Sequence, residues 1–294
     1  MAKTALILEG GGYRGIYTGG VLDVLLENGI DQFSSVWGVS AGAMNGGNYV
    51  ARQHGRTMRV MLAFRDDPRL MSLYSLVRNG NITNPDFMYD EIQTRLDPFD
   101  NETFNASPLP LYVVATDVVF GGPAYLRVAH MPEDLPKVQA SASLPGISQI
   151  VEVDGMRLLD GGTADSVPFA VALGLDDAKA PEGYEPADQA VVVLTQDRAY
   201  KKPLDCEKLA IRTHRYDKFP YYLDALKTRG QRYNNQREQL FELEKQGKLL
   251  VIAPEKPVTV SVAEKNGAPL LDLYFQGRNQ TLARLDEIRA FISA

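Results

Sequence analysis

Residues 4–53 read TALILEGGGYRGIYTGGVLDVLLENGIDQFSSVWGVSAGAMNGGNYVARQ, and this stretch decides the fold. The apolar run at 4–8 ends in a glycine cluster, which predicts a buried strand that meets a tight turn. Residues 16–28 carry apolar side chains at helical spacing, with a glycine just beyond them as a stop. A second apolar run at 33–39 and a helix of small residues at 41–53 repeat the pattern. Strand, turn and helix repeated in this order predict an α/β fold with a parallel sheet covered on both faces.

The second of these turns carries a serine at its apex, in the sequence Gly38-Val39-Ser40-Ala41-Gly42. A serine hydroxyl is a weak nucleophile unless it is exposed and next to a base. Glycines two residues before and after it permit a sharp strand-to-helix turn that displays the hydroxyl. The helix N-terminus then favours the negative charge that develops during attack. A glycine-lined turn without chemistry would have the same pattern, but the place of Ser40 between an apolar run and a helix favours a nucleophile.

The first turn is a glycine-rich loop, Gly10-Gly11-Gly12-Tyr13-Arg14-Gly15, and it has two interpretations. It matches the dinucleotide fingerprint G-x-G-x-x-G, which would make the chain a nucleotide-binding oxidoreductase. That hypothesis expects an acidic residue at the end of the second strand, where the sequence has Val39 and Ser40 instead. Converging backbone N–H groups of glycines can equally hold an oxyanion. Arg14 adds a fixed positive charge beside the loop, unless it only forms a surface salt bridge.

A third candidate is Asp160-Gly161-Gly162, which follows a predicted strand at 157–159. Asp-Gly is also an ordinary turn signal. The aspartate gains interest because a serine nucleophile needs a base and histidines are few. The chain has three of them: His54, His130 and His214. Each lies in a charged or loop segment that gives no sign of a catalytic triad, although the sequence excludes none of them.

Together these segments resemble the three motifs of the patatin-like phospholipase family, in the same order and setting. The resemblance covers about residues 4–173 and extends to Ala115-Thr116-Asp117 and Leu144-Pro145-Gly146, which are similar to bacterial members. It implies a three-layer α/β/α fold with a central, mostly parallel sheet. Residues 174–294 are similar to the C-terminal extension of one bacterial subgroup, and we expect them to pack on or continue the same unit.

The resemblance also implies roles for individual residues. Ser40 would be the nucleophile and Asp160 its base, in a dyad without histidine. The backbone amides of Gly11 and Gly12, with Ala41, would form an oxyanion hole in a loop that also contains Gly10, Arg14 and Gly15. Gly38, Gly42, Gly161 and Gly162 would be motif glycines, and Gly162 stands where the family often has alanine. No metal or other cofactor is implied.

The remaining elements are predicted from periodicity and turn signals. We expect helices at 56–64, 69–77, 85–96, 135–143, 221–248 and 279–292. We expect strands at 111–119, 125–128, 150–153, 157–159, 191–195 and 249–252, the first two as an antiparallel pair. Residues 179–189, with two prolines and a glycine, are the best candidate for a boundary or a long surface loop.

Composition limits the function further. With 45% hydrophobic and 23% charged residues, the chain has the composition of a soluble globular protein. Its net charge of -6, without a basic stripe, argues against nucleic acid as a partner. The single cysteine, Cys206, excludes an internal disulfide, and no signal-like or membrane-spanning segment is evident. We therefore expect a cytoplasmic protein that reaches lipid surfaces only transiently, through local patches.

Three hypotheses follow from the sequence. The first is a serine acyl hydrolase acting on lipid or other carboxylic esters, with pocket walls from residues 56–96 and from the C-terminal part. The second is a nucleotide-binding oxidoreductase, which leaves Ser40 and Asp160 without a role. The third is a catalytically silent lipid-binding protein. The sequence does not identify the natural substrate or the oligomeric state.

Overall fold

The computed structural model describes residues 2–70, 72, 75–77, 80–175 and 180–294. An eight-stranded sheet lies at its centre, in the order β5-β6-β3-β2-β1-β7-β8, with β4 also paired to β3. The strands are β1 (Thr4–Leu8), β2 (Ser35–Val39), β3 (Leu111–Asp117), β4 (Pro123–Val128), β5 (Val151–Val153), β6 (Met156–Asp160), β7 (Gln189–Val193) and β8 (Leu249–Ile252). Five neighbouring strands run parallel: β3, β2, β1, β7 and β8. Strands β4 and β6 pair antiparallel with β3, and β5 pairs antiparallel with β6. The predicted mostly parallel sheet is confirmed.

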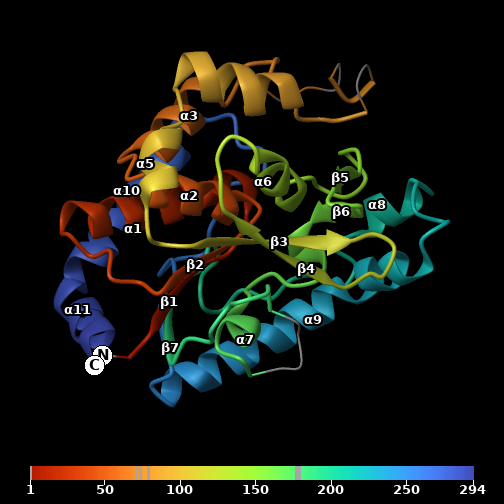
Figure 1. Cartoon of the computed structure of the whole chain (residues 1–294). Coiled ribbons are helices and arrows are strands. Elements are labelled where there is room, and N and C mark those ends of the chain that lie inside the picture. Colours follow the sequence, from red (N-terminus) through yellow and green to blue (C-terminus); the bar gives the residue numbers. More distant parts are fainter. Residues whose placement is uncertain (1, 71, 73–74, 78–79, 176–179) are drawn as a thin grey trace.

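Helices cover both faces of the sheet, as Figure 1 shows. The longer elements are α1 (Gly15–Glu27), α2 (Ala41–Val50), α3 (Arg56–Phe64), the π-helix η2 (Asp86–Leu96), α6 (Leu135–Ser141), α9 (Pro220–Lys245), α10 (Gly267–Ala283) and α11 (Leu285–Ser293). The short ones are η1 (Gly12–Arg14), α5 (Asn101–Ala106), η3 (Gly161–Thr163), α7 (Phe169–Ala172) and α8 (Lys208–Arg212). Helices α1, α2, α6 and α10 lie on one side of the sheet, and α7 and α9 lie on the other.

Strand β1 explains why two helical layers form. Its side chains alternate, so that Leu6 and Leu8 join the apolar cluster beneath α1 and α2, while Ala5 and Ile7 join the cluster beneath α7 and α9. All of these side chains are fully buried. A strand that is apolar on both faces is stable only when helices cover both sides of its sheet. The three-layer α/β/α architecture is therefore confirmed.

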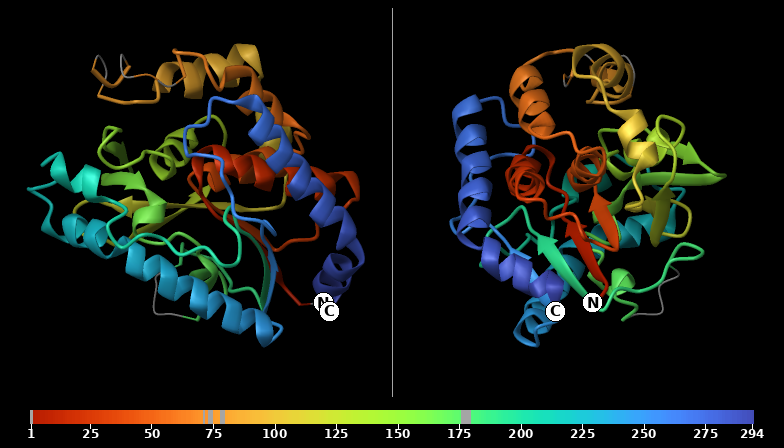
Figure 2. Two further views of the ribbon diagram at one scale, coloured as in Figure 1. Left: turned by 180° about the vertical axis from the view of Figure 1, so that it is seen from behind. Right: turned by 60° about the vertical axis from the view of Figure 1, so that its left-hand side comes forward.

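The C-terminal part of the chain is built into the same unit. Strand β7 pairs with β1 in parallel, and β8 extends the sheet beyond it. Helix α10 crosses α1 closely, since a methyl group added at Gly20 would lie 2.2 Å from the Tyr274 carbonyl oxygen. Figure 2 shows α10 and α11 along one side of the sheet. This part also reaches the carboxyl end of β1, since a methyl group added at Gly11 would lie 2.6 Å from the Thr195 side-chain oxygen.

Several predicted elements differ in detail. The helix predicted at 279–292 is two helices, α10 and α11, which separate at Arg284. Helix α10 begins much earlier than predicted, with the side chain of Asn266 accepting the Ala268 amide as its cap. The helix at 85–96 is a π-helix. Of the helix expected at 69–77, residues 71 and 73–74 lie outside the described residues. Among the described residues, no helix is long and apolar enough to cross a bilayer.

Candidate active site

Ser40 lies at the apex of a strained turn between β2 and α2. Its backbone has φ 56° and ψ −121°, a left-handed region that residues other than glycine seldom adopt. Gly38 and Gly42 make this turn possible because the chain crosses itself there. A methyl group added at Gly38 would lie 2.5 Å from the Gly42 carbonyl oxygen, and one at Gly42 would lie 2.3 Å from the Leu8 carbonyl oxygen. The backbone therefore makes the sharp strand-to-helix turn that the sequence predicts.

Asp160 lies at the end of β6, which pairs antiparallel with β3. The side chain is 1% exposed, and its Oδ1 accepts the Gly162 amide at 2.8 Å. Its buried Oδ2 has no hydrogen bond of standard geometry. Burial raises the pKa of Asp160 above the ordinary 3.8, against the opposing effects of the Arg229 charge, the Ser40 hydroxyl and the Gly162 amide.

The glycine loop packs directly on the serine turn. A methyl group added at Gly10 would lie 2.9 Å from the Ser40 Cβ. Gly12 has φ +57°, and an added methyl group there would lie 2.5 Å from the Val262 carbonyl oxygen. Among the described residues, the amides of Gly11 and Gly12 donate to no other group. Both glycines line, together with Ser40, a polar cavity described below.

The amide of Ser40 itself is already used. It donates to the Ser141 hydroxyl at 2.8 Å, and that hydroxyl donates to the Val114 carbonyl at 2.6 Å. Ser141 is fully buried at the end of α6. It therefore fixes the serine turn to β3. Ser141 was not predicted from the sequence, since a serine in a run of small helical residues has no distinguishing pattern.

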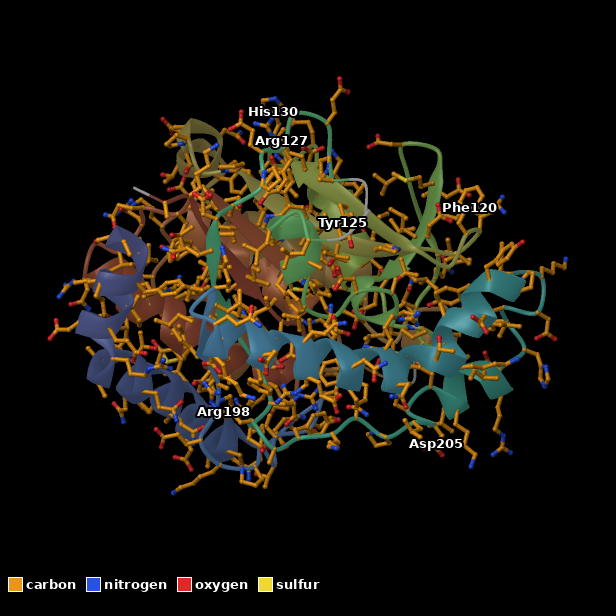
Figure 3. All side chains as sticks on the ribbon, turned by 90° about the horizontal axis from the view of Figure 1, so that it is seen from below. Phe120, Tyr125, Arg127, His130, Arg198 and Asp205 are labelled. Carbon is orange, nitrogen blue, oxygen red and sulfur yellow. The ribbon has the colours of Figure 1, made fainter. Side chains whose placement is uncertain are left out.

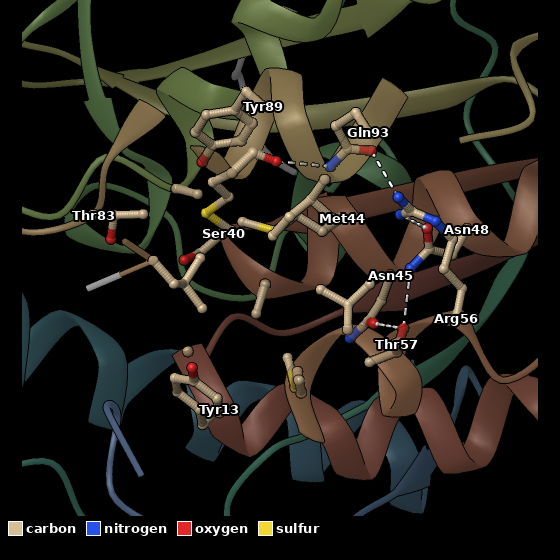
Figure 4. Close-up of a pocket in the computed structure, with 18 of the residues that line it drawn as sticks. Tyr13, Ser40, Met44, Asn45, Asn48, Arg56, Thr57, Thr83, Tyr89 and Gln93 are labelled. Carbon is tan, nitrogen blue, oxygen red and sulfur yellow. Dashed lines mark hydrogen bonds between the residues drawn. The ribbon is translucent and has the colours of Figure 1, made fainter. Parts of the chain in front are cut away.

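Two cavities meet at Ser40. The first, of about 150 Å³, is lined mainly by apolar side chains, including Met44, Met61, Met88 and Ile92. Figure 4 shows Ser40 at one end of it and the buried Arg56 at the other. Arg56 donates to the Asn48 side chain at 2.9 Å, as part of a polar network that closes that end. Residues 56–96 supply much of the wall, as the sequence predicts.

The second cavity, of about 320 Å³, is polar. Ser40, the glycine loop and Asp160 all line this cavity. Asp160 does not line the first cavity. Its far side comes from the C-terminal part: Gln196, Tyr200, Lys202, Cys206, Glu207, Arg229, Tyr233 and Val262. The sequence predicts walls from this part but singles out none of these residues as lining, because each lies far from the motifs along the chain.

Arg14 is half-buried and lines the polar cavity. Its Nε is buried and has no hydrogen-bond partner. Within the described part of the chain it makes no ion pair. The alternative that Arg14 serves a surface salt bridge therefore has no support. Its neighbour Gly15 is buried, where an added methyl group would lie 2.9 Å from the Ala41 Cβ.

The histidines lie away from these cavities. His54 is exposed and contacts Glu27, and His214 is exposed and lies 3.2 Å from Asp217 Oδ2. His130 is exposed just beyond β4, at the rim of the molecule in Figure 3. None of the three lines either cavity. Asp160, by contrast, lines the polar cavity together with Ser40.

Fold and geometry define an α/β/α protein whose candidate site lies at the carboxyl ends of parallel strands, where such folds bind ligands. The family model described as patatin-like phospholipase matches residues 6–173, and the chain belongs to this family. A second model, described as a domain of unknown function, matches residues 219–293.

Similar proteins include an uncharacterized protein, YjjU, from Escherichia coli strain K12, which is 28% identical over 58% of this chain and 48% of its own length. An uncharacterized NTE family protein, Rv1063c, from Mycobacterium tuberculosis is 29% identical over 59% of this chain and 46% of its own. The chain thus matches about half the length of these curated relatives. The crystal structure of VipD from Legionella pneumophila is 14% identical, with a TM-score of 0.48, over 98% of this chain and 67% of that one.

Proposed function

We propose that this protein hydrolyses carboxylic esters of lipids, with Ser40 as nucleophile and Asp160 as base. The observation that carries the proposal is the meeting of an apolar and a polar cavity at Ser40, with the buried Asp160 carboxylate in the polar one. Family membership supports the same activity. A relative from Aspergillus terreus, 29% identical over 62% of this chain and 12% of its own length, is named lysophospholipase nte1.

The proposed reaction begins when the Ser40 oxygen bonds to the ester carbonyl carbon and its proton passes to Asp160. The tetrahedral oxyanion is held by the free amides of Gly11 and Gly12, together with the amide of Ala41 at the start of α2. Collapse of this intermediate breaks the ester bond, and the leaving alkoxide takes the proton from Asp160. Water then adds to the acyl-enzyme and gives a proton to Asp160. The bond between the acyl carbon and the Ser40 oxygen breaks, which releases the carboxylic acid, and Ser40 takes the proton back from Asp160.

The environment of Asp160 suits this role. A general base works best when its pKa is near the operating pH, and burial raises the pKa of Asp160 towards that range. Its Oδ1 is held by the Gly162 amide, which leaves the buried Oδ2 free of other standard hydrogen bonds. A free lone pair on Oδ2 can accept the serine proton without breaking a competing bond.

The two cavities suggest how the substrate lies. The acyl chain would occupy the apolar cavity along Met44 and Met61, where burial of methylene groups favours binding by about 0.8 kcal/mol each. The alcohol half would occupy the polar cavity, because that cavity contains Asp160, which must give its proton to the leaving oxygen. The Arg56 network would limit the length of the acyl chain.

Release of fatty acid from phospholipids, lysophospholipids, glycerides and short p-nitrophenyl esters tests the proposal. We expect wild-type protein to hydrolyse at least one lipid class and folded Ser40→Ala to retain less than about a hundredth of that rate. Hydrolysis that survives in Ser40→Ala would rule out Ser40 as the nucleophile. Absence of hydrolysis on every ester would favour the silent lipid-binding hypothesis.

A further inference from the structure

The polar cavity contains three cations and three carboxylates, and among the described residues two of the cations form no ion pair with any of these carboxylates. Its charged side chains are Glu9, Arg14, Asp160, Lys202, Glu207 and Arg229. Glu207 is paired with Arg229. Both oxygens of Glu9 are occupied, since they accept from the Thr195 amide at 2.6 Å and from the Tyr233 hydroxyl. These carboxylates are therefore committed to other groups.

Two of the cations have no such partner. Among the described residues, neither Arg14 nor Lys202 has a side-chain hydrogen bond or an ion pair; the Lys202 Nζ instead lies over the Tyr233 ring, 4.4 Å from its centroid. Burial, with the nearby Arg229 charge, lowers the pKa of Lys202 to about 8. Unpaired cations in a partly buried cavity are costly unless an anionic ligand compensates them.

The position of Lys202 is fixed by α9. Its amide donates to the Asn234 side-chain oxygen at 2.8 Å, and its carbonyl accepts from the Asn234 side-chain nitrogen at 3.0 Å. The next residue packs closely on the same helix, because a methyl group added at Gly230 would lie 2.4 Å from the Pro203 carbonyl oxygen. The ammonium is thus held on a rigid support, as a binding group needs to be.

The cations lie on the Asp160 side of the site. A methyl group added at Gly162 would lie 2.8 Å from Arg229 Nη2 and 3.0 Å from Asp160 Oδ1. The Arg229 guanidinium therefore adjoins the turn that holds the proposed base. An alcohol that takes its proton from Asp160 would leave through this cationic part of the cavity.

We propose that Lys202, together with Arg14 and Arg229, binds a phosphate group on the alcohol half of the ester, so that acyl glycerol phosphates are preferred over neutral acyl glycerols. This inference rests on the proposed function. Guanidinium and ammonium groups are the usual phosphate ligands of proteins. Lys202 would then be a specificity residue supplied by the C-terminal part of the chain.

A matched pair of substrates tests this proposal: 1-oleoyl-glycerol 3-phosphate and 1-oleoylglycerol. The readout is the ratio of kcat/KM for the phosphate ester to kcat/KM for the neutral ester. Lys202→Met keeps an unbranched side chain and removes the charge that lies over Tyr233, and we expect it to lower the ratio by about tenfold to a hundredfold, mainly through KM. Lys202→Arg, which keeps the charge, should retain most of the ratio. Lys201→Met, at the exposed neighbouring position, is the matched control and should leave it unchanged.

An unchanged ratio in folded Lys202→Met would overturn the proposal, as would an equal fall in Lys201→Met. Calorimetry on Ser40→Ala measures binding without turnover. It shows whether the site prefers the glycerol phosphate headgroup or free inorganic phosphate. We expect glycerol 3-phosphate to bind this protein more tightly than inorganic phosphate, and the Lys202→Met change to weaken that binding. Tighter binding of inorganic phosphate would overturn the headgroup assignment. If no ester is hydrolysed, the proposed function fails, while calorimetry still decides whether the phosphate site exists.

Discussion

Replacing Asp160 by asparagine removes the proposed proton acceptor but keeps the shape of the side chain. The amide oxygen can still accept the Gly162 amide, which Asp160 Oδ1 accepts at 2.8 Å. The lost capability is proton acceptance from Ser40, and general base catalysis contributes about 100- to 10,000-fold to a rate. We therefore expect kcat for fatty-acid release to fall by that factor, which corresponds to about 3 to 5 kcal/mol in the activation barrier.

The effect on stability should have the opposite sign. Because burial raises the pKa of Asp160, its ionised form is less favourable in the folded protein than in the unfolded chain. This destabilises the wild type at pH values above the raised pKa, and the effect disappears as pH falls through that pKa towards the ordinary value of 3.8. Asparagine carries no charge, so the Tm of Asp160→Asn at neutral pH should equal or exceed that of the wild type. If the melts show this Tm, a loss of activity in Asp160→Asn is not due to unfolding.

The assay is fatty-acid release at several pH values, with circular dichroism and thermal melts on both proteins. We also expect wild-type kcat/KM to fall on the acid side of a pKa above 3.8, since protonated Asp160 accepts no proton. Asp160→Asn that is folded and retains more than about a tenth of wild-type kcat would refute the argument. Asp160 would then be only part of a turn.

Three further predictions concern residues around the dyad. Alanine or glutamine at each histidine (His54, His130 and His214) should leave kcat/KM within about tenfold of wild type, and a folded variant as inactive as Ser40→Ala would instead indicate a triad. Arg14→Ala should lower kcat/KM on a phospholipid by about tenfold while changing Tm little, and an unchanged value on both phospholipid and neutral ester would exclude a role for its charge. Ser141→Ala leaves the Ser40 amide and the Val114 carbonyl without their partner, so thermal melts should report a loss of about 1–3 kcal/mol; an unchanged Tm would mean that this link does not stabilise the turn.

Much of the fold follows from local patterns in the sequence. The bounds predicted for β1 and α3 agree with the structure, because an apolar strand beside glycines and an amphipathic helix carry their signals in adjacent residues. The early start of α10 was not predictable in this way. Its first turns contain Gly267 and Pro269, which weaken helix signals, and it is stabilised by packing on α1 across more than two hundred residues of chain.

Some residues of the candidate site could likewise be predicted from local sequence, and others could not. Ser40, Asp160 and the glycine loop stand in short motifs that the sequence displays. Lys202 and Arg229 stand in charged segments, where a lysine or arginine ordinarily lies in solvent. Only the packing of α9 under the sheet turns them towards Ser40. A single sequence carries no signal for such long-range contacts.

Fluorophosphonate labelling tests the central claim most directly, because this reagent reacts with serines that a neighbouring base has activated. The protein is incubated with the reagent, and mass spectrometry locates the modified residue. We expect one label on wild-type protein, on the peptide that contains Ser40, and none on folded Ser40→Ala. Label on a different serine, or equal labelling of Ser40→Ala, would contradict the account.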